Sequence, residues 1–398
     1  MELFKRNAKG KPIFWRISNS GLIITVTYGM IGKQARSETI YTNRPVEDEV
    51  KSLIAAKRRE GYKSLSDLYD NAPKYLFDKS LIDYLNTYLP KNNTDNNGNF
   101  IPMLCKTLED NKPFFRGTYF GEYKINGERC LISATKENNL FNNVSLNYRS
   151  RKGIDWTDKL KYLDEYILPK LPQDFIDLMI EEGVALDGEL YLPGYGINEI
   201  NSFIKNTELP QHYKLQFWCY DIAIEGVSAI ARYTKLESMF TEDIIKFKTK
   251  EEHLNNKRRL LLLPQSYINN LYIARQIRDI NIALGFEGLV IREENTSYQF
   301  GGKRNNAMLK FKKILDGYFT IIDIIPEGIK RSNLPKFICK NDINDETFEC
   351  TLNAPHDYQE NILLNKEYYI GKLMFVEYRE RSGVKQVPFH AKGINIKI

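Results

Sequence analysis

The chain has 398 residues, of which 42% are hydrophobic and 27% charged, and its formal net charge is +6. This length and apolar content can form two or three packed domains, which excludes a globally disordered chain. No apolar run approaches the roughly 18 residues of a membrane span, and the first residues lack the apolar core of a secretory signal. The five scattered cysteines include no CxxC pair and are typical of reduced thiols. We therefore expect an intracellular, cytoplasmic protein that is not secreted and binds no membrane.

Residues 1–90 predict a small α+β module. The segments IFWRIS and LIITVTYG alternate apolar and polar side chains, as strands do, and residues 46–65 have helical periodicity with a basic run, KRR, near the end. FWRIS and YGMIGKQ, followed by this helix, resemble the WGR module, although Tyr28 and Met30 replace its Trp and Arg. This resemblance implies contact with the backbone of nucleic acids. The alternative for the basic run is a solvated helix face.

The rest of the chain predicts a linker and two further domains. Residues 91–100, KNNTDNNGNF, are polar and rich in Asn, which is typical of a linker. Residues 101–315 alternate strand-like and helical segments, which predicts an α/β or α+β domain with mixed sheets. Residues 316–398 contain several short strand-like segments, which predicts a small barrel.

Lys124 is the first candidate for chemistry. It lies in GEYKINGERC, between two strand-like segments, with Gly127 three residues later. A lysine presented by such a turn can act as a nucleophile if desolvation or a neighbouring positive charge lowers its pKa. A surface lysine in a turn is the alternative.

Later segments place further charged residues at the ends of predicted strands. They are LDGELY with Asp187 and Glu189, WCYDI with Asp221, FEGLVIR with Glu287, and LKFKK with Lys310 and Lys312. The two lysines of LKFKK share one face of a strand, where they repel each other unless an anion such as phosphate binds both. Solvated strand ends and a basic edge strand are the alternatives.

These segments, in this order, resemble the nucleotidyltransferase motifs of the covalent ligase and capping-enzyme superfamily. YKINGERC resembles the KxDGxR motif that carries the adenylated lysine, and YRSRKG, LDGELY, WCYDI, FEGLVIR and LKFKK resemble the motifs that follow it. IPMLCKTLED resembles the segment that precedes the lysine motif in DNA ligases, and the C-terminal strands resemble the ligase OB domain. The resemblance covers residues 100–398. It implies an α+β multidomain ATP-dependent DNA ligase, with an adenylation domain of mixed and antiparallel sheets followed by an OB-fold barrel.

The resemblance also implies a role for each motif side chain around one ATP. Lys124 attacks the α-phosphate; Lys310 and Lys312 hold that phosphate; Arg129 contacts the ribose and the incoming strand; Arg151 contacts the nucleotide; Tyr220 stacks on adenine; Glu122 reads the adenine edge; Glu189 contacts the ribose and a metal ion; and Glu287 binds the metal ion. The expected cofactors are ATP and Mg²⁺ or Mn²⁺. The expected partner is nicked duplex DNA, bound by a monomer during replication or repair in a bacterial or phage-infected cell.

Two departures from the motifs leave alternatives open. Asn126 replaces the usual Asp of KxDGxR, so its side chain keeps an acceptor oxygen but loses the charge. The last segment, VPFHAKGINIKI, lacks the arginines of the corresponding ligase motif. The alternatives are an RNA ligase, a capping guanylyltransferase, and a catalytically decayed protein that binds DNA ends.

Overall fold

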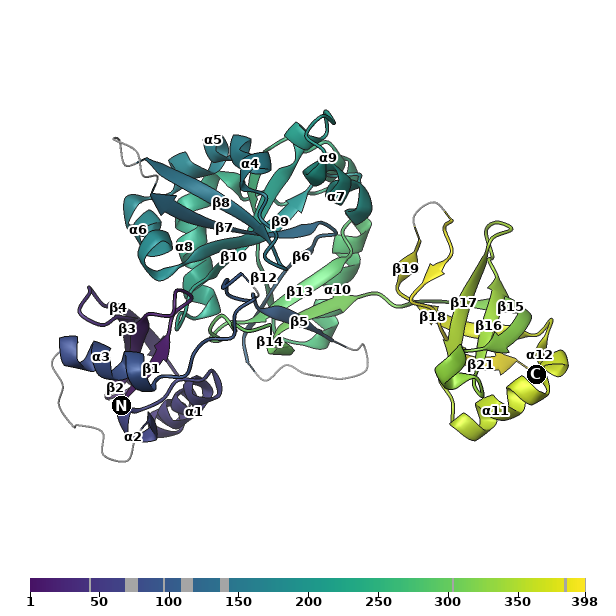
Figure 1. The fold of residues 1–398 in the computed structure, drawn as a ribbon, viewed down its shortest axis with the longest axis horizontal. Coiled ribbons are helices and arrows are strands. Elements are labelled where there is room, and N and C mark those ends of the chain that lie inside the picture. The colour runs from purple at the N-terminus through teal and green to yellow at the C-terminus, as the bar shows by residue number, and fades with distance from the viewer. Residues whose placement is uncertain are drawn as a thin grey trace. The chain divides into compact units, whose positions relative to one another are not determined.

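The structure, a computed structural model, describes residues 1–42, 44–68, 78–95, 97–108, 117–136, 143–302, 304–382 and 385–397. The chain divides into two compact units, residues 1–311 and 312–398, and each is described by itself (Figure 1). Among the described residues, no helix is both long enough and apolar enough to cross a membrane.

The N-terminal part of the first unit is a small α+β arrangement. Its antiparallel sheet has the order β1-β2-β3-β4. Ile13, Trp15 and Ile17 of β2 are buried, because alternate side chains of a strand point to the same face. The elements are β1 (Glu2–Arg6), β2 (Pro12–Ser20), β3 (Ile23–Met30), β4 (Arg36–Tyr41), α1 (Val46–Arg59), α2 (Leu65–Leu68) and α3 (Asp78–Tyr88). The predicted strands and helix are confirmed, and β1 is an addition to them.

Lys57, in the basic run of α1, is buried and joins this part to the rest of the unit. Its ammonium lies 3.1 Å from Glu60 and donates to the carbonyl of Gly226 at 3.3 Å and to the hydroxyl of Ser297. The alternative of a fully solvated helix face is therefore wrong for Lys57, whereas Arg59 is exposed.

Two five-stranded sheets form the larger part of the first unit. One has the order β11-β10-β9-β7-β8 and the other β12-β6-β13-β14-β5. The pairs β10–β11 and β14–β5 are parallel, whereas β10–β9, β7–β8 and β6–β13 are antiparallel, so the predicted mixed sheets are present. The strands are β5 (Leu104–Thr107), β6 (Tyr119–Lys124), β7 (Glu128–Lys136), β8 (Val144–Ser150), β9 (Ala185–Tyr191), β10 (Gln216–Ala223), β11 (Leu260–Leu262), β12 (Ser266–Ile268), β13 (Gly288–Glu293) and β14 (Arg304–Lys312).

Helices cover these sheets. Helix α6 packs on β7, α8 on β10 and α10 on β13. The buried core includes Trp218 and Leu190, from neighbouring strands β10 and β9. The helices are α4 (Thr157–Leu160), η1 (Lys161–Leu163), α5 (Asp164–Ile167), η2 (Leu168–Lys170), α6 (Gln173–Glu182), α7 (Ile197–Lys205), η3 (His212–Lys214), α8 (Ala229–Phe240), η4 (Thr241–Asp243), α9 (Lys250–Leu254) and α10 (Leu271–Ala283).

The second unit is a closed five-stranded barrel with the order β15-β16-β17-β21-β18, which is consistent with an OB-fold. Its interior contains Phe319, Phe337, Met374 and Val376, and the predicted small barrel is confirmed. The elements are β15 (Leu315–Pro326), η5 (Ile329–Arg331), β16 (Pro335–Lys340), β17 (Thr347–Leu352), α11 (His356–Leu364), α12 (Lys366–Tyr369), β18 (Leu373–Tyr378), β19 (Glu380–Arg381), β20 (Pro388–Phe389) and β21 (Lys392–Lys397).

Candidate functional site

Lys124 ends strand β6 and forms a close ion pair with Glu287. Its Nζ lies 2.5 Å from Glu287 Oε2, and both side chains are mostly buried. The register of β6 and β13 explains this contact. Lys124 is opposite Gly288, and the N–H of Glu287 donates to the carbonyl of Lys124 at 2.9 Å. Two residues far apart in the chain therefore meet because two antiparallel strands pair next to them.

The environment of Lys124 favours its charged form. Burial lowers the pKa of Lys124, but the carboxylates of Glu287 and Glu189 raise it, and the net result is a pKa above the ordinary value. The expectation of a pKa lowered by desolvation or a positive neighbour is therefore wrong for the ligand-free protein. The resting side chain is an ammonium held by carboxylates, and its proton must leave before the nitrogen can attack.

Two glycines of the motifs are needed because backbones approach closely around Lys124. A Cβ at Gly127 would lie 2.4 Å from the carbonyl oxygen of Leu190. A Cβ at Gly188 would lie 2.5 Å from the ring of Phe217 and 2.6 Å from the carbonyl oxygen of Trp218. The turn after Lys124 thus packs directly against strand β9, which carries Glu189.

Glu189 lies on β9 beside Tyr220 of β10. The Tyr220 hydroxyl donates to Glu189 Oε2 at 3.2 Å. Burial raises the pKa of Glu189 to about 7, although Lys124 and Arg129 act in the opposite direction. The Tyr220 ring also faces two guanidinium groups, with centroid distances of 6.0 Å for Arg129 and 5.4 Å for Arg292. A cation bound at Glu189 would favour its ionised form.

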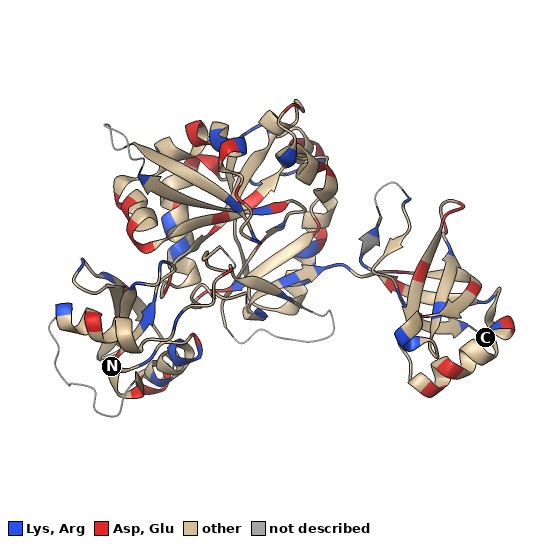
Figure 2. Ribbon diagram, viewed as in Figure 1, with Lys and Arg blue, Asp and Glu red and all other residues tan. Residues whose placement is uncertain are grey.

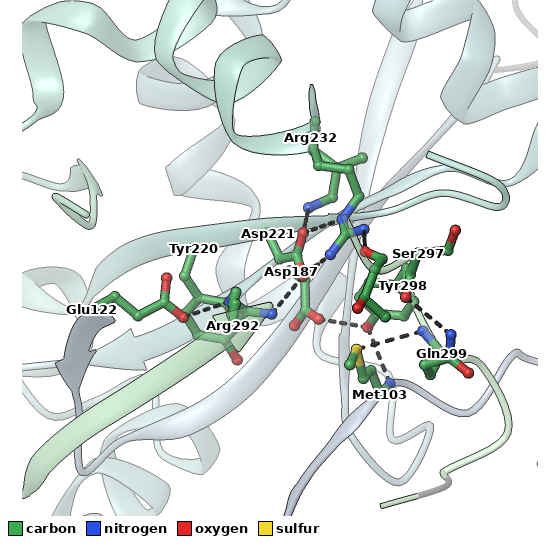
Figure 3. A network of polar contacts seen from close by, with 12 residues as sticks. Met103, Glu122, Asp187, Tyr220, Asp221, Arg232, Arg292, Ser297, Tyr298 and Gln299 are labelled. Atoms are coloured by element: carbon green, nitrogen blue, oxygen red, sulfur yellow. Dashed lines mark hydrogen bonds and ion pairs between the residues drawn. The ribbon is translucent and has the colours of Figure 1, made fainter. Parts of the chain in front are cut away.

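Arg129 is held by Asp187, which is fully buried. The guanidinium donates to Asp187 through Nε at 2.8 Å and Nη2 at 2.5 Å, and through Nη1 to the carbonyl of Met103 at 2.5 Å. The hydroxyl of Tyr298 donates to the same carboxylate at 2.6 Å (Figure 3). Asp187 and Tyr298 therefore fix the orientation of Arg129.

A second buried network holds Glu122. Arg292 donates to Glu122 at 2.8 Å and to Asp221 at 2.6 Å, and Asp221 also accepts from Arg232 at 2.6 and 3.2 Å (Figure 3). Burial raises the pKa of Glu122 to about 7, despite the adjacent Arg292. Burial acts in the same direction on Asp221, but its two arginines outweigh burial and lower its pKa. These ion pairs connect β6, β10, α8 and β13.

Sequence reasoning missed the positioning roles of three residues in these networks. Tyr298 and Arg292 contact motif carboxylates that lie far away in the chain, and Arg232 contacts Asp221, 11 residues before it. Arg292 stands within a motif, but Tyr298 and Arg232 lie outside the motifs. The one sequence signal that could have pointed to Tyr298 is the change from apolar to polar residues after β13.

The other predicted residues lie on strand β14 and in the turn after β8. Lys310 and Lys312 are partly buried on β14, on the face opposite the buried Phe311, and β14 is the neighbour of β13 in the sheet. Lys312 is also the first residue of the second unit. Arg151 lies in the turn after β8 with an exposed side chain. Within the described residues, it takes no part in the contacts that join Lys124, Glu189 and Glu287.

The donors at this site fit a hard divalent cation. The described residues contain no cluster of three or more candidate metal ligands. Glu189 and Glu287, however, both influence the pKa of Lys124, and Mg²⁺ is commonly bound by one or two carboxylates together with phosphate oxygens and water. These two carboxylates are the residues that would hold such an ion, which would neutralise phosphate charge.

Comparison with known proteins identifies the family. The profile described as "ATP dependent DNA ligase domain" matches residues 102–312, more than half of the chain. The DNA ligase of Enterobacteria phage T4 is 24% identical over 179 residues, which cover 42% of this chain and 34% of that protein, so the match spans about a third of its length.

Solved structures show the same fold. One described as "Pmar-Lig_Pre." has a TM-score of 0.56 at 12% identity, over 81% of this chain and 72% of that chain. Another, from a structure-function analysis of Lig E DNA ligases, has a TM-score of 0.51 at 13% identity, over 74% of this chain and 98% of that chain. The profile match over more than half of the chain shows that the chain belongs to the ATP-dependent DNA ligase family.

Proposed function

We propose that this protein is an ATP-dependent DNA ligase that seals nicks in duplex DNA. The observation that carries the proposal is the ion pair between Lys124 and Glu287, with Glu189 close enough to raise the same pKa. An ammonium held by carboxylates cannot attack phosphorus. Such a lysine suits a reaction that begins only after the nucleotide and its counter-ion have bound and the nitrogen has lost its proton.

The proposed chemistry has three steps. Lys124 loses its proton, and its nitrogen attacks the α-phosphorus of ATP, which forms a P–N bond and expels pyrophosphate. The 5′-phosphate of the nick then attacks the same phosphorus and breaks the P–N bond, so that AMP moves to the DNA. The 3′-hydroxyl finally attacks the activated 5′-phosphorus and releases AMP. Because the leaving groups are good, the protein contributes mainly positioning and charge neutralisation.

The arrangement supports the remaining proposed roles. Tyr220 would stack on adenine, and Glu122, oriented by Arg292, would read the adenine edge. Arg129, oriented by Asp187, would contact the ribose and the incoming strand. Lys310 and Lys312 would hold the α-phosphate, and Arg151 would contact the nucleotide. Glu189 and Glu287 would bind Mg²⁺ or Mn²⁺.

The proposed organisation is a nucleic-acid-binding module at residues 1–90, a linker at 91–100, an adenylation domain at 101–315 and an OB-fold at 316–398. A monomer suffices for this chemistry, because all proposed nucleotide contacts come from one chain.

Covalent labelling tests the proposal. The protein is incubated with α-labelled ATP or GTP and Mg²⁺, and the product is analysed on a denaturing gel and in a nick-sealing assay. We expect ATP to label the protein, GTP not to label it, and Lys124→Ala to abolish both labelling and sealing. The matched control is Lys214→Ala, an exposed lysine of the same domain, which should behave as the unchanged protein.

The rival functions give different outcomes. Labelling by GTP would identify a capping guanylyltransferase, and sealing of nicked RNA but not DNA would identify an RNA ligase. Retention of DNA-end binding without any ATP labelling would indicate a catalytically decayed protein. This alternative is considered because Asn126 replaces the usual Asp of the lysine motif.

A further inference from the structure

A groove of about 780 Å³ lies within the first unit, between the N-terminal sheet and the edge of β7 and β8. Four parts of the chain line it: the end of β1 with the turn that follows, described residues between Asn86 and Phe100, the strands β7 and β8, and helix α6 with the glycine after it. The groove therefore contains residues of the N-terminal module, of the predicted linker and of the larger domain.

The lining of this groove is positively charged. Its ionisable side chains are all basic: Arg6, Lys9, Lys11, Lys91 and Arg149. Among the described residues that line it there is no Asp or Glu, although the whole chain has almost as many acidic as basic residues. Burial and the neighbouring Lys11 lower the pKa of Lys9, as expected where cations gather without a counter-charge.

Two of the cations are held in place by backbone carbonyls. The Arg6 guanidinium donates to the carbonyls of Asn86 at 2.7 Å and Gly10 at 2.9 Å. The Arg149 guanidinium lies 4.1 Å from the Phe100 ring centroid and donates to the Phe100 carbonyl at 3.2 Å. Neutral carbonyls orient both groups without removing their charge. Arg149 also interacts with the carboxylates of Asp95 and Asp187, which do not line the groove, but burial outweighs them and lowers its pKa.

The neutral lining favours a sugar–phosphate backbone over unstacked bases. Asn92, Asn99, Ser133 and Thr135 supply amide and hydroxyl groups of the kind that contact phosphate and sugar oxygens. The aromatic ring in the lining, Phe100, is buried, and Arg149 packs on it, so it offers no platform for a base. The groove therefore suits a duplex, whose bases remain stacked.

Helix α1 does not provide a comparable surface. Its first turn is acidic and its last turn basic, as the two colours along this helix in Figure 2 show. Lys57 is buried, and its ammonium contacts Glu60 and the Ser297 hydroxyl within the protein. The β1–β2 turn, in contrast, contributes Lys9 and Lys11 to a lining that contains no acidic residue.

We propose that this groove binds the phosphate backbone of the duplex DNA on which the ligase acts. The proposal rests on the proposed function and extends it, because it assigns DNA binding to the boundary between the module and the adenylation domain and not to the basic helix. The groove holds the duplex by its charge, and the chemistry remains at Lys124.

The test uses the double variant Lys11→Gln/Lys91→Gln in the full chain. Both lysines are exposed, so the fold should be kept. Binding of a fluorescein-labelled nicked duplex is measured across salt concentrations. We expect the dissociation constant to rise on the order of tenfold. The slope of the logarithm of the association constant against the logarithm of salt concentration should become less steep by about 2, because each lost phosphate contact contributes about 0.9 to its magnitude. ATP labelling of Lys124 should be unchanged.

The matched control is Lys51→Gln/Lys79→Gln, which removes the same charge from exposed positions of the module outside the groove. Affinity and salt slope equal to those of this control would overturn the proposal, as would a loss of affinity for duplex RNA but not for duplex DNA. If ATP labels neither the unchanged protein nor the variants, the proposed function fails, while the binding data still decide the groove.

Discussion

At the scale of single residues, burial and partners decide the charge of each motif side chain. Glu189 and Glu122 have carboxyl pKa values raised to about 7 by burial, whereas Asp221, equally buried, has a lowered pKa because two arginines contact it. Side chains of one chemical type thus acquire different protonation behaviour within the same buried region of the first unit. The raised pKa of Glu189 makes the free energy of unfolding depend on pH.

We predict that Glu189→Gln weakens the pH dependence of unfolding. The folded carboxyl holds its proton up to about pH 7, while the unfolded one releases it near the ordinary glutamate pKa of 4.5, so this group stabilises the fold at low pH and loses that effect as pH rises between these values. Removing it should flatten the decline in the free energy of unfolding from pH 5 to pH 7 by at most about 3 kcal/mol.

Denaturant unfolding followed by tryptophan fluorescence measures this change, because Trp15, Trp156 and Trp218 all lie in the first unit. Glu251→Gln, at an exposed glutamate of the same unit, is the control and should keep the original slope. If the free energy of unfolding depends on pH with the same slope in Glu189→Gln and in the unchanged protein, the raised pKa of Glu189 is contradicted.

At the scale of elements, the end of helix α1 is one of the places where the N-terminal module contacts the rest of the first unit. Lys57 of α1 reaches Ser297 and the carbonyl of Gly226, and its ammonium lies 5.7 Å from the Trp15 ring centroid. A second contact is the ion pair at 2.9 Å between Lys5 of β1 and Glu225, the residue before Gly226. The segments 225–226 and 297–298 therefore join the module to the residues beside Asp187.

We predict that Lys57→Met lowers the free energy of unfolding of the first unit by about 2–4 kcal/mol, because it leaves Glu60 and the Ser297 hydroxyl without a buried partner. Arg59→Met, on the exposed side of the same helix, should change it by less than about 0.5 kcal/mol. Tryptophan fluorescence in urea reports both values, with Trp15 as a local probe. Equal effects of the two substitutions would show that the buried contacts of Lys57 do not stabilise the unit.

At the scale of the whole molecule, the two units have separate cores. The barrel buries Phe319, Phe337 and Met374 among its own strands, and closure leaves no free sheet edge in it. All five cysteines are free, and two of them, Cys339 and Cys350, lie buried in this barrel with their sulfurs 3.9 Å apart. These thiols can therefore report the unfolding of the second unit.

We predict two distinct unfolding transitions. Labelling of Cys339 and Cys350 by a thiol reagent, mapped by mass spectrometry along a urea series, should follow a curve with a different midpoint from tryptophan fluorescence, which reports only the first unit. Cys130 and Cys219, buried in the first unit, serve as the internal control and should be labelled along the fluorescence curve. Coincidence of all the curves would mean that the units unfold together.

Much of the fold was predictable because it rests on local periodicity. The alternation in β2 and β3, the helical pattern of α1 and the short strands of the barrel are all present in the structure. The shorter strands β5, β11 and β12 were not predicted, because three or four residues carry too little pattern and these strands depend on their neighbours in the sheet.

By itself, the sequence determined which chemical groups are available to the proposed site, since Lys124, the motif carboxylates and the lysines of LKFKK can be read from their motifs and spacing. Only the tertiary structure decided which polar and charged side chains meet. The pairs Lys124–Glu287, Arg129–Asp187 and Lys57–Ser297 join residues far apart in the chain. The physical reason is that the charge state of a buried group depends on its partners and its desolvation, and both are set by strand pairing and packing, not by sequence spacing.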